Sequence, residues 1–257
     1  MERKGTLILT EGRSGSNWLG SLSNGTGQLG KSKEWLDKQY LGVKVGSLPF
    51  DALVERIITL SSTPNRYFCV KLFPRYLFDV QNRYGLDLIL EMQKRFDTQL
   101  LMLRRRDRIA QAVSFAKAYQ SKKWTSTATE VKDPQYNFDL ICRCLFHIER
   151  AYGFWDSYIS ARSLDVVAFQ YEDLLNVPDR FVEALAAHAN VTDYEIPESN
   201  LAIQRDGVSI QWRERFIEEM KDKNILSHSI PRQPPVTTSN LSKFLRKRPI
   251  RPLPFTV

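Results

Sequence analysis

Residues 6–18 constrain the fold of this 257-residue chain more than any other stretch. A short apolar run, Thr6–Thr10, is followed by small residues and one arginine, and then by a helix-compatible segment, in the order TLILTEGRSGSNW. This order predicts a strand, a tight loop and a helix N-terminus. Small residues let backbone N–H groups converge on an oxyanion, and the helix dipole adds partial positive charge there. The stretch therefore indicates an anion-binding loop.

The loop differs from the Walker A motif of nucleotide-binding proteins. That motif, Gly-x-x-x-x-Gly-Lys-Ser/Thr, places its lysine on the phosphates and its hydroxyl on Mg²⁺. Here the basic residue, Arg13, comes before the turn at Gly15. The three cysteines and three histidines also form no recognised metal-binding pattern. We therefore expect a phosphate-like ligand and no metal.

Composition indicates an ordinary globular protein. Hydrophobic residues make up 42% and charged residues 26% of the chain, and its length suits one large α/β domain. The first strand follows the N-terminal residues directly, without the apolar region of a signal peptide, and no window approaches 18 uninterrupted apolar residues. We therefore expect a cytoplasmic protein that does not span a membrane.

The charge of the chain points to anionic partners. A net charge of +8 and an isoelectric point near 9.4 suit nucleic acid, a membrane surface, or phosphate and sulfate esters. Part of the excess lies in residues 104–106 and part in the tail beyond residue 240, and no helix-turn-helix, zinc-finger or RNA-binding signature accompanies them. Phosphate or sulfate esters are therefore favoured and no nucleic acid is expected. A basic protein that binds nucleic acid or an anionic surface remains the non-enzyme alternative.

Short apolar runs separated by helical patterns predict an α/β fold. This order is typical of βαβ units around a parallel sheet, here a three-layer sandwich with four to five strands. The expected strands are Thr6–Thr10, Tyr67–Leu72, Gln99–Leu103 and Asp165–Gln170. The expected helices are Asn17–Gly25, Ser32–Gln39, Asp51–Ser61, Gly85–Arg95, Asp107–Gln120, Asp139–Ser160, Pro178–Ala189 and Ser209–Lys223.

Two segments fall outside this pattern. Residues 121–137 are polar and irregular, and long enough to form a functional loop or lid. A proline-containing stretch starts at Pro231 and leads into the basic tail. We therefore expect one domain over residues 1–230 and a Pro-rich basic extension over residues 231–257.

A second basic site is expected where the third strand ends. Ligands of such sheets bind at the carboxyl ends of the strands, and this strand runs into residues 104–106. Ser114 follows Arg106 by about two helical turns. An arginine and a hydroxyl in this arrangement can hold a second phosphate through charge-assisted hydrogen bonds. The alternative is that the arginines are solvated and Ser114 is a small packing residue.

These residues carry a family resemblance. Residues 12–19 resemble the 5′-phosphosulfate loop of sulfotransferases that use 3′-phosphoadenosine-5′-phosphosulfate (PAPS), and residues 106–114 resemble their 3′-phosphate motif. Within that superfamily the chain is most similar to the bacterial trehalose-sulfotransferase-like branch. The further matching segments are Gly30–Glu34, Arg105–Asp107, Gln111–Ser114, Trp124, Tyr171–Leu174 and Gln211–Trp212.

The resemblance implies a P-loop-like sulfotransferase fold and a role for each matching residue. The 5′-phosphosulfate and adenine would be bound by residues of the first loop and helix, namely Gly12, Arg13, Ser14, Gly15, Ser16, Asn17 and Trp18. Arg106 and Ser114 would bind the 3′-phosphate, which stays on the product 3′,5′-adenosine bisphosphate. Arg13 would stabilise charge, and Glu34 falls on the position of the general base. Without the resemblance, Glu34 reads as an exposed acid in a first helical turn, where acids are favoured.

The acceptor is expected to be a hydroxyl of a carbohydrate or small molecule, such as a glycan or glycolipid, and members of the branch can form homodimers. Glu34, Lys71 and Trp124 would line its site, although Lys71 also reads as a snorkelling surface lysine. Asn17 stands where a serine or threonine is usual, and Lys123 stands where the branch often carries glycine. Lys122 and Lys123 together suggest an anionic acceptor. A nucleotide kinase, or a related fold that binds PAPS without turnover, remains the alternative.

Overall fold

Four parallel strands form the central sheet of the computed structural model, which describes residues 3–125, 128–129, 131–198 and 207–222. The strands lie in the order β2-β1-β3-β4. Their bounds are Lys4–Leu9 for β1, Phe68–Leu72 for β2, Asp97–Arg104 for β3 and Val167–Gln170 for β4. The structure confirms the parallel sheet and all four predicted strands, with end points that differ by at most two residues.

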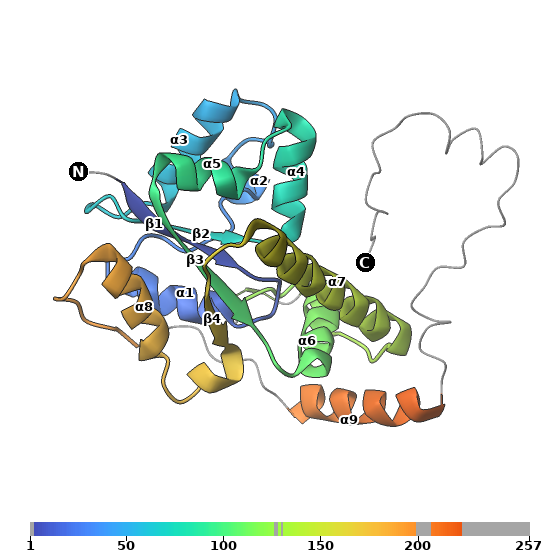
Figure 1. The fold of residues 1–257 in the computed structure, drawn as a ribbon. Helices are drawn as coiled ribbons and strands as arrows, with labels where there is room; N and C mark the ends of the chain where they lie inside the picture. Colours follow the sequence, from blue (N-terminus) through green and yellow to red (C-terminus); the bar gives the residue numbers. More distant parts are fainter. Residues whose placement is uncertain (1–2, 126–127, 130, 199–206, 223–257) are drawn as a thin grey trace, which may run out of the picture.

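Alternation of side chains along each strand builds two apolar cores. Ile8 and Leu101 face one side of the sheet with the residues of α1 and α8. Leu7 and Leu100 face the other side, where α3, α4, α5, α6 and α7 supply the packing residues. Figure 1 shows α1 and α8 on one side of the sheet and α3, α4 and α5 on the other. The expected three-layer α/β sandwich is therefore confirmed.

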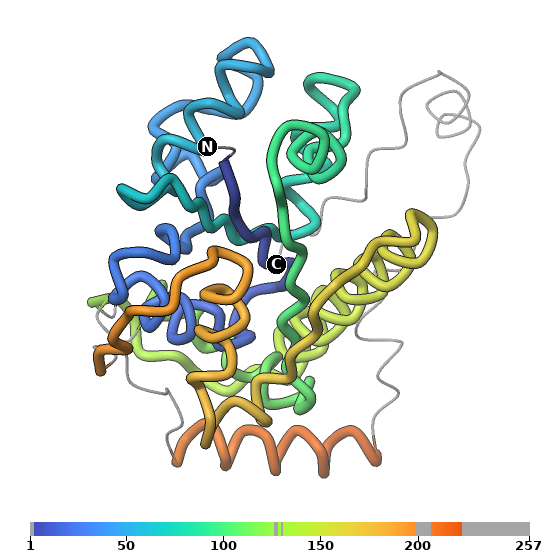
Figure 2. Tube along the Cα trace, turned by 60° about the vertical axis from the view of Figure 1, so that its left-hand side comes forward, coloured from blue at the N-terminus to red at the C-terminus, as the bar shows by residue number. Residues whose placement is uncertain are grey.

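The helices of the described residues cover both faces of the sheet and one end of it. Figure 2 shows α9 at the edge of the molecule, where it contacts α6 and α7. Their bounds are Ser16–Gly25 (α1), Lys38–Leu41 (α2), Phe50–Ser61 (α3), Pro74–Tyr84 (α4), Leu88–Arg95 (α5), Arg108–Ser121 (α6), Phe138–Arg162 (α7), Asp179–Ala189 (α8) and Gly207–Asp222 (α9), with a 3₁₀ turn over Tyr171–Leu174 (η1).

Two helix predictions need correction. The predicted helix over residues 32–39 is not helical before Asp37. The backbone N–H of Lys71 donates to the carbonyl of Lys33 and pairs that residue with β2, and a turn follows in which the Asp37 N–H donates to the Glu34 carbonyl at 2.8 Å. Helix α2 begins only after Asp37, whose side chain caps it. Helix α4 was not predicted. Pro74 occupies its first turn, where proline is tolerated because that N–H has no helical partner.

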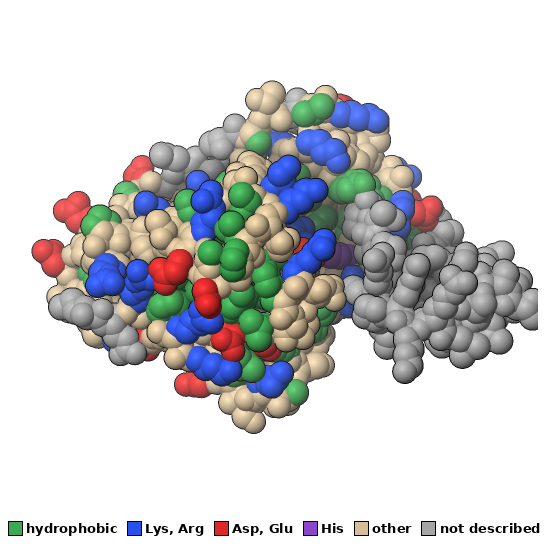
Figure 3. Space-filling view, turned by 90° about the horizontal axis from the view of Figure 1, so that it is seen from above, with side chains coloured by type: hydrophobic (Ala, Val, Ile, Leu, Met, Phe, Trp, Pro, Cys, Tyr) green, Lys and Arg blue, Asp and Glu red, His purple; other side chains and the backbone are tan. Residues whose placement is uncertain are grey.

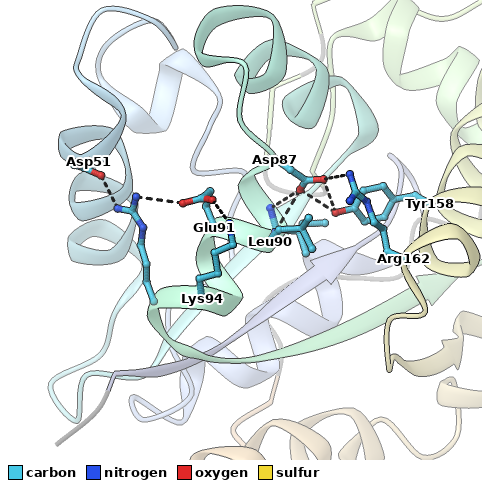
Figure 4. Close-up of polar contacts among 9 residues, drawn as sticks. Asp51, Asp87, Leu90, Glu91, Lys94, Tyr158 and Arg162 are labelled. Atoms are coloured by element: carbon cyan, nitrogen blue, oxygen red, sulfur yellow. Dashed lines mark hydrogen bonds and ion pairs between the residues drawn. The ribbon is translucent and has the colours of Figure 1, made fainter.

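A chain of polar contacts fixes α5 against its neighbours (Figure 4). Asp87 caps α5 and accepts hydrogen bonds from the hydroxyl of Tyr158 on α7 at 2.9 and 3.0 Å. At the other end of α5, Arg95 donates to Asp51 on α3 at 2.7 Å. These contacts, at opposite ends of a short helix, tie together the layer that covers one face of the sheet.

The net positive charge is not gathered into one patch on the face that Figure 3 shows. Lys and Arg side chains are spread over this face, with Asp and Glu side chains among them. The basic extension expected over residues 231–257 lies outside the described residues. Within the part of the chain that the structure describes, no helix has the length and apolar character needed to cross a membrane.

A hydrogen-bonded network at the edge of the sheet opposite the loop predicts a pH-dependent stability. His188 Nε2 lies 3.1 Å from a carboxylate oxygen of Asp97, and Lys4 Nζ lies 2.8 Å from the other oxygen. The hydrogen bond from Lys4 is the main cause that lowers the pKa of Asp97. A lowered pKa contributes stability above the ordinary value of about 4, and this stability is lost as pH falls through the lowered value.

We therefore expect Asp97→Asn to be less stable than the wild type at neutral pH, with a difference that shrinks below about pH 4. The difference is small because Asp97 is partly exposed and its ion pairs are screened. Urea unfolding of both proteins across this pH range measures it. A difference that stays constant with pH would show that the ion pairs of Asp97 contribute nothing.

Candidate active site

The loop between β1 and α1 is held in shape by short polar contacts and by glycine. Arg13 and Gly15 have positive φ angles of 65° and 89°. A Cβ atom at Gly15 would lie 2.3 Å from the ring of Tyr171, so only glycine fits. The Ser14 side chain is buried and accepts a hydrogen bond from the Thr10 hydroxyl at 2.7 Å. Ser14 therefore shapes the loop from inside and does not line the cavity.

Helix α1 begins without a side-chain cap among the described residues. Gly15 occupies the cap position, and the first helical hydrogen bond runs from the Leu19 N–H to the Gly15 carbonyl at 3.1 Å. The backbone N–H groups of Ser16, Asn17 and Trp18 are therefore left without a partner within the helix. Such groups, together with the helix dipole, form an anion-binding site at a helix N-terminus.

A cavity of about 590 Å³ opens beside this helix terminus, at the carboxyl ends of the strands. Its walls come from the β1–α1 loop, the segment 34–40, the start of α4, the middle of α6 and the loop after α6. This volume is typical of a small-molecule site. The structure brings together these residues predicted from the sequence: Gly12, Arg13, Gly15, Ser16, Asn17, Trp18, Glu34, Ser114 and Trp124.

Arg13 spans the cavity wall between α6 and the loop that follows it. Its Nε donates to the Ser114 hydroxyl at 2.9 Å, and its Nη1 donates to the Trp124 carbonyl at 2.6 Å. Burial, and then the neighbouring Arg105 guanidinium, lower the pKa of Arg13 to about 10. Arg13 thus stays charged at neutral pH beside a second cation. A bound anion would relieve their repulsion, as expected for a phosphate or sulfate site.

The structure brings Arg105, and not Arg106, into the cavity. Arg105 lines the cavity, packs its guanidinium over the Tyr171 ring, and lies 3.8 Å from Glu172. Arg106 lies outside, with 62% of its side chain exposed, and donates to both carboxylate oxygens of Asp173 at 2.8 and 3.0 Å. Of the predicted pair, Ser114 is therefore at the cavity and Arg106 is not.

Alternation along β3 explains this exchange. Leu101 and Leu103 face the α1 and α8 side of the sheet, and Arg105 is the next residue in that series. Arg104 belongs to the opposite series and pairs with Asp156 on α7. The alternation of side chains along the strand thus separates Arg105 from the other two arginines of the run.

Glu34 reaches the cavity from the start of the turn that precedes α2. Only 23% of its side chain is exposed. Lys71 Nζ lies 3.6 Å from its Oε1, Arg75 Nη2 lies 3.7 Å from its Oε2, and the Tyr76 hydroxyl donates to Oε2 at 3.4 Å. Two cations and one hydroxyl therefore surround a carboxylate that still faces the cavity.

Lys71 lies behind the cavity surface. Its side chain is 3% exposed and its Nζ also donates to the side-chain oxygen of Asn17 in the first turn of α1. The sequence suggested that Lys71 is either a snorkelling surface lysine or a residue that lines the acceptor site. The structure shows that it is neither. Asn17, which departs from the usual serine or threonine, has this buried ammonium as its partner.

Aromatic rings line both ends of the cavity. Trp18 packs edge-on against Tyr171, with ring centroids 6.1 Å apart. Trp124 is 40% exposed and packs edge-on against Phe115 at 5.4 Å. Trp18 and Trp124 were both predicted from the sequence, and Tyr171 was noted there without a site role.

Sequence reasoning missed other cavity residues. Glu11 is 2% exposed, and its Oε1 accepts a hydrogen bond from the Gly12 N–H at 2.8 Å and lies 3.6 Å from His147 Nε2. Arg75 lies in the first turn of α4, three residues after the end of β2, with its guanidinium over the rings of Phe73 and Tyr76. Their positions next to strand ends are the signal that could have found them, since strand ends in such sheets carry the ligand site.

The sequence model of the Stf0 sulphotransferase family matches residues 5–219, which include the sheet, the loop and every cavity residue named above. The chain belongs to this family. It is therefore a sulfotransferase, as the resemblance implied, and its α/β fold is consistent with the fold of that enzyme class. No curated protein matches this sulfotransferase.

Proposed function

We propose that this sulfotransferase takes its sulfuryl group from PAPS and transfers it to a hydroxyl of a carbohydrate, with Glu34 as the general base. The single observation that carries the proposal is the cavity that joins an uncapped helix N-terminus and two arginines to a carboxylate. The residues fit PAPS because its phosphate and sulfate groups need N–H donors and fixed positive charge. PAPS, when bound, supplies an activated sulfuryl group.

The donor half of the cavity is formed by α1, Arg13, Arg105 and Ser114. We propose that the N–H groups at the start of α1 and Arg13 hold the 5′-phosphosulfate. Arg105 takes the role of the 3′-phosphate ligand, together with the Ser114 hydroxyl that Arg13 now contacts. The edge-on pair of Trp18 and Tyr171 forms the wall on which adenine packs. Gly12 and Ser14 act on the donor through the shape of the loop.

The acceptor half of the cavity is formed by the segment 34–40, by Phe73 and Arg75, and by the loop after α6. Rings of Tyr40, Phe73 and Trp124 offer apolar faces for a sugar, and Asp37, Gln39 and Arg75 offer hydrogen bonds to its hydroxyls. This mixture of aromatic surface and a few polar groups is typical of a site for a polyhydroxylated ligand. It supports a carbohydrate acceptor. Lys122, also at the cavity, favours one that carries negative charge.

The protein's own residues accept the proton and stabilise the negative charge that the transfer produces. Glu34 accepts the proton of the acceptor hydroxyl, so that the oxygen becomes a nucleophile as the proton leaves it. Arg13 and the N–H groups of α1 stabilise negative charge on the phosphosulfate and on the leaving phosphate. Because these donors are fixed before the reaction, they need no reorganisation during it.

Release of 3′,5′-adenosine bisphosphate from PAPS tests the acceptor class. We expect release to be accelerated by members of a panel of neutral and acidic saccharides, with sulfated product seen by mass spectrometry. Phenols and aliphatic alcohols serve as controls. Release that phenols accelerate and saccharides do not would contradict the carbohydrate acceptor.

A further inference from the structure

Lys71 is a buried cation that the proposed function has not yet used. It stands at the carboxyl end of β2, and its side chain is 3% exposed. Burial lowers its pKa, and the carboxylate of Glu34 opposes that effect. An ammonium taken out of water is costly unless it is paired and hydrogen-bonded. Its partners therefore indicate what it does.

These partners belong to the two halves of the site. Lys71 Nζ donates to the side-chain oxygen of Asn17, in the first turn of α1 on the donor side. The same Nζ lies 3.6 Å from Glu34 Oε1, on the acceptor side. The main chain also connects Lys71 to the segment that carries Glu34, because the Lys71 N–H donates to the carbonyl of Lys33 at 2.9 Å, one residue before Glu34. Lys71 thus contacts both the proposed base, Glu34, and the helix α1 on the donor side.

We propose that Lys71 is a positioning residue that fixes the Glu34 carboxylate relative to α1. This inference rests on the proposed role of Glu34 as the base. The charged and titratable groups facing Glu34 come from three elements: Lys71 from β2, Arg75 and Tyr76 from α4, and Tyr40 from α2. Lys71 is the buried cation among them, whereas 52% of the Arg75 side chain is exposed and its charge is screened by water.

The arrangement also accounts for the departure at Asn17. A serine or threonine hydroxyl is shorter than an asparagine side chain. The amide oxygen of Asn17 gives Lys71 a second partner that is independent of the base. When Glu34 has accepted a proton and lost its charge, Lys71 keeps this hydrogen bond. The buried ammonium of Lys71 therefore remains hydrogen-bonded both before and after the proton transfer.

The split between kcat and KM tests the proposal. A catalytic group misplaced by about 1 Å can cost about 10²-fold in rate, so we expect Lys71→Met to lower kcat by about 10–100-fold while the KM for PAPS stays close to that of the wild type. Lys33→Met is the matched control. It removes an exposed lysine whose Nζ lies over the Trp35 and Tyr40 rings, and we expect little change in kcat.

An unchanged kcat in folded Lys71→Met would overturn the proposal. The reciprocal measurement leaves Lys71 in place, which matters if that variant does not fold. In Glu34→Gln, the Lys71 ammonium loses its neighbouring carboxylate, so its own titration midpoint is expected to fall. An unchanged Lys71 midpoint would likewise contradict the pairing. Binding of 3′,5′-adenosine bisphosphate to the wild type is measured separately, so a failure of the donor site is distinguished from a failure of this inference.

Discussion

Replacing Glu34 by glutamine is expected to lower turnover by about 10²–10⁴-fold, the usual contribution of a general base. Glutamine keeps the size of the side chain and can still contact Tyr76, but it cannot accept a proton at neutral pH. The affinity for 3′,5′-adenosine bisphosphate should be unchanged, because Glu34 lies on the acceptor side of the cavity. Turnover with PAPS and a saccharide acceptor, together with calorimetric titration of the bisphosphate, measures both effects.

The control for this prediction is Asp37→Asn. Asp37 is a second carboxylate at the cavity, three residues further along, and it caps α2. Asparagine caps helices about as well as aspartate, so the fold is preserved. We expect a much smaller loss of turnover than in Glu34→Gln. Equal losses in the two variants would show that the cavity needs negative charge in general and that Glu34 is not the base.

Replacing Arg105 by alanine is expected to weaken binding of 3′,5′-adenosine bisphosphate by about 10–100-fold. A hydrogen bond to a charged group contributes about 1.5–3 kcal/mol, and each 1.4 kcal/mol is a factor of ten in affinity. Arg106→Ala is the matched variant, one residue away and identical in charge. It should bind nearly as well as the wild type, since the Arg106 side chain lies outside the cavity and pairs with Asp173. Calorimetric titration of both variants measures the difference.

The opposite order would contradict the donor site as built here. If Arg106→Ala bound the bisphosphate weakly and Arg105→Ala bound it normally, Arg106 would have to leave Asp173 and turn toward the ligand. The spacing of Arg106 and Ser114 would then be the better guide to the 3′-phosphate site. A thermal unfolding curve for each variant shows whether a loss of affinity reflects a loss of fold.

The sequence was most informative where local pattern and structure coincide. An apolar run predicted the strand at the start of residues 6–18, and small residues predicted the loop after it. In the structure, Gly15 has a positive φ in this loop and α1 starts at Ser16. Strands β1, β2 and β3 were recognisable because strands buried on both faces are continuously apolar, whereas β4 is partly exposed and was recognised from its short apolar run. Asp107, the first residue of the predicted helix over residues 107–120, caps α6 through its side chain, which accepts from the Ala110 N–H.

The remainder depends on contacts between segments far apart in the sequence. Residues 32–37 have a helical composition, but pairing of Lys33 with β2 and the turn after it keep them out of a helix. The partners of Lys71 could not be read from its neighbours, because Asn17 and Glu34 come from two other segments. Alternation separates Arg105 from Arg106, but the choice between them also depended on which face of β3 lies on the α1 side of the sheet. Composition and spacing gave the kind of residue at the site, and the sheet determined which one faces the cavity.

Calorimetric titration of the wild-type protein with 3′,5′-adenosine bisphosphate tests the central claim most directly, with ATP and Mg²⁺ as the comparison. The cavity offers two arginines and an uncapped helix N-terminus for the phosphates. We therefore predict binding at micromolar concentration or tighter for the bisphosphate without any metal, and much weaker binding of ATP. Clear binding of ATP with Mg²⁺, and none of the bisphosphate, would contradict a PAPS-dependent site.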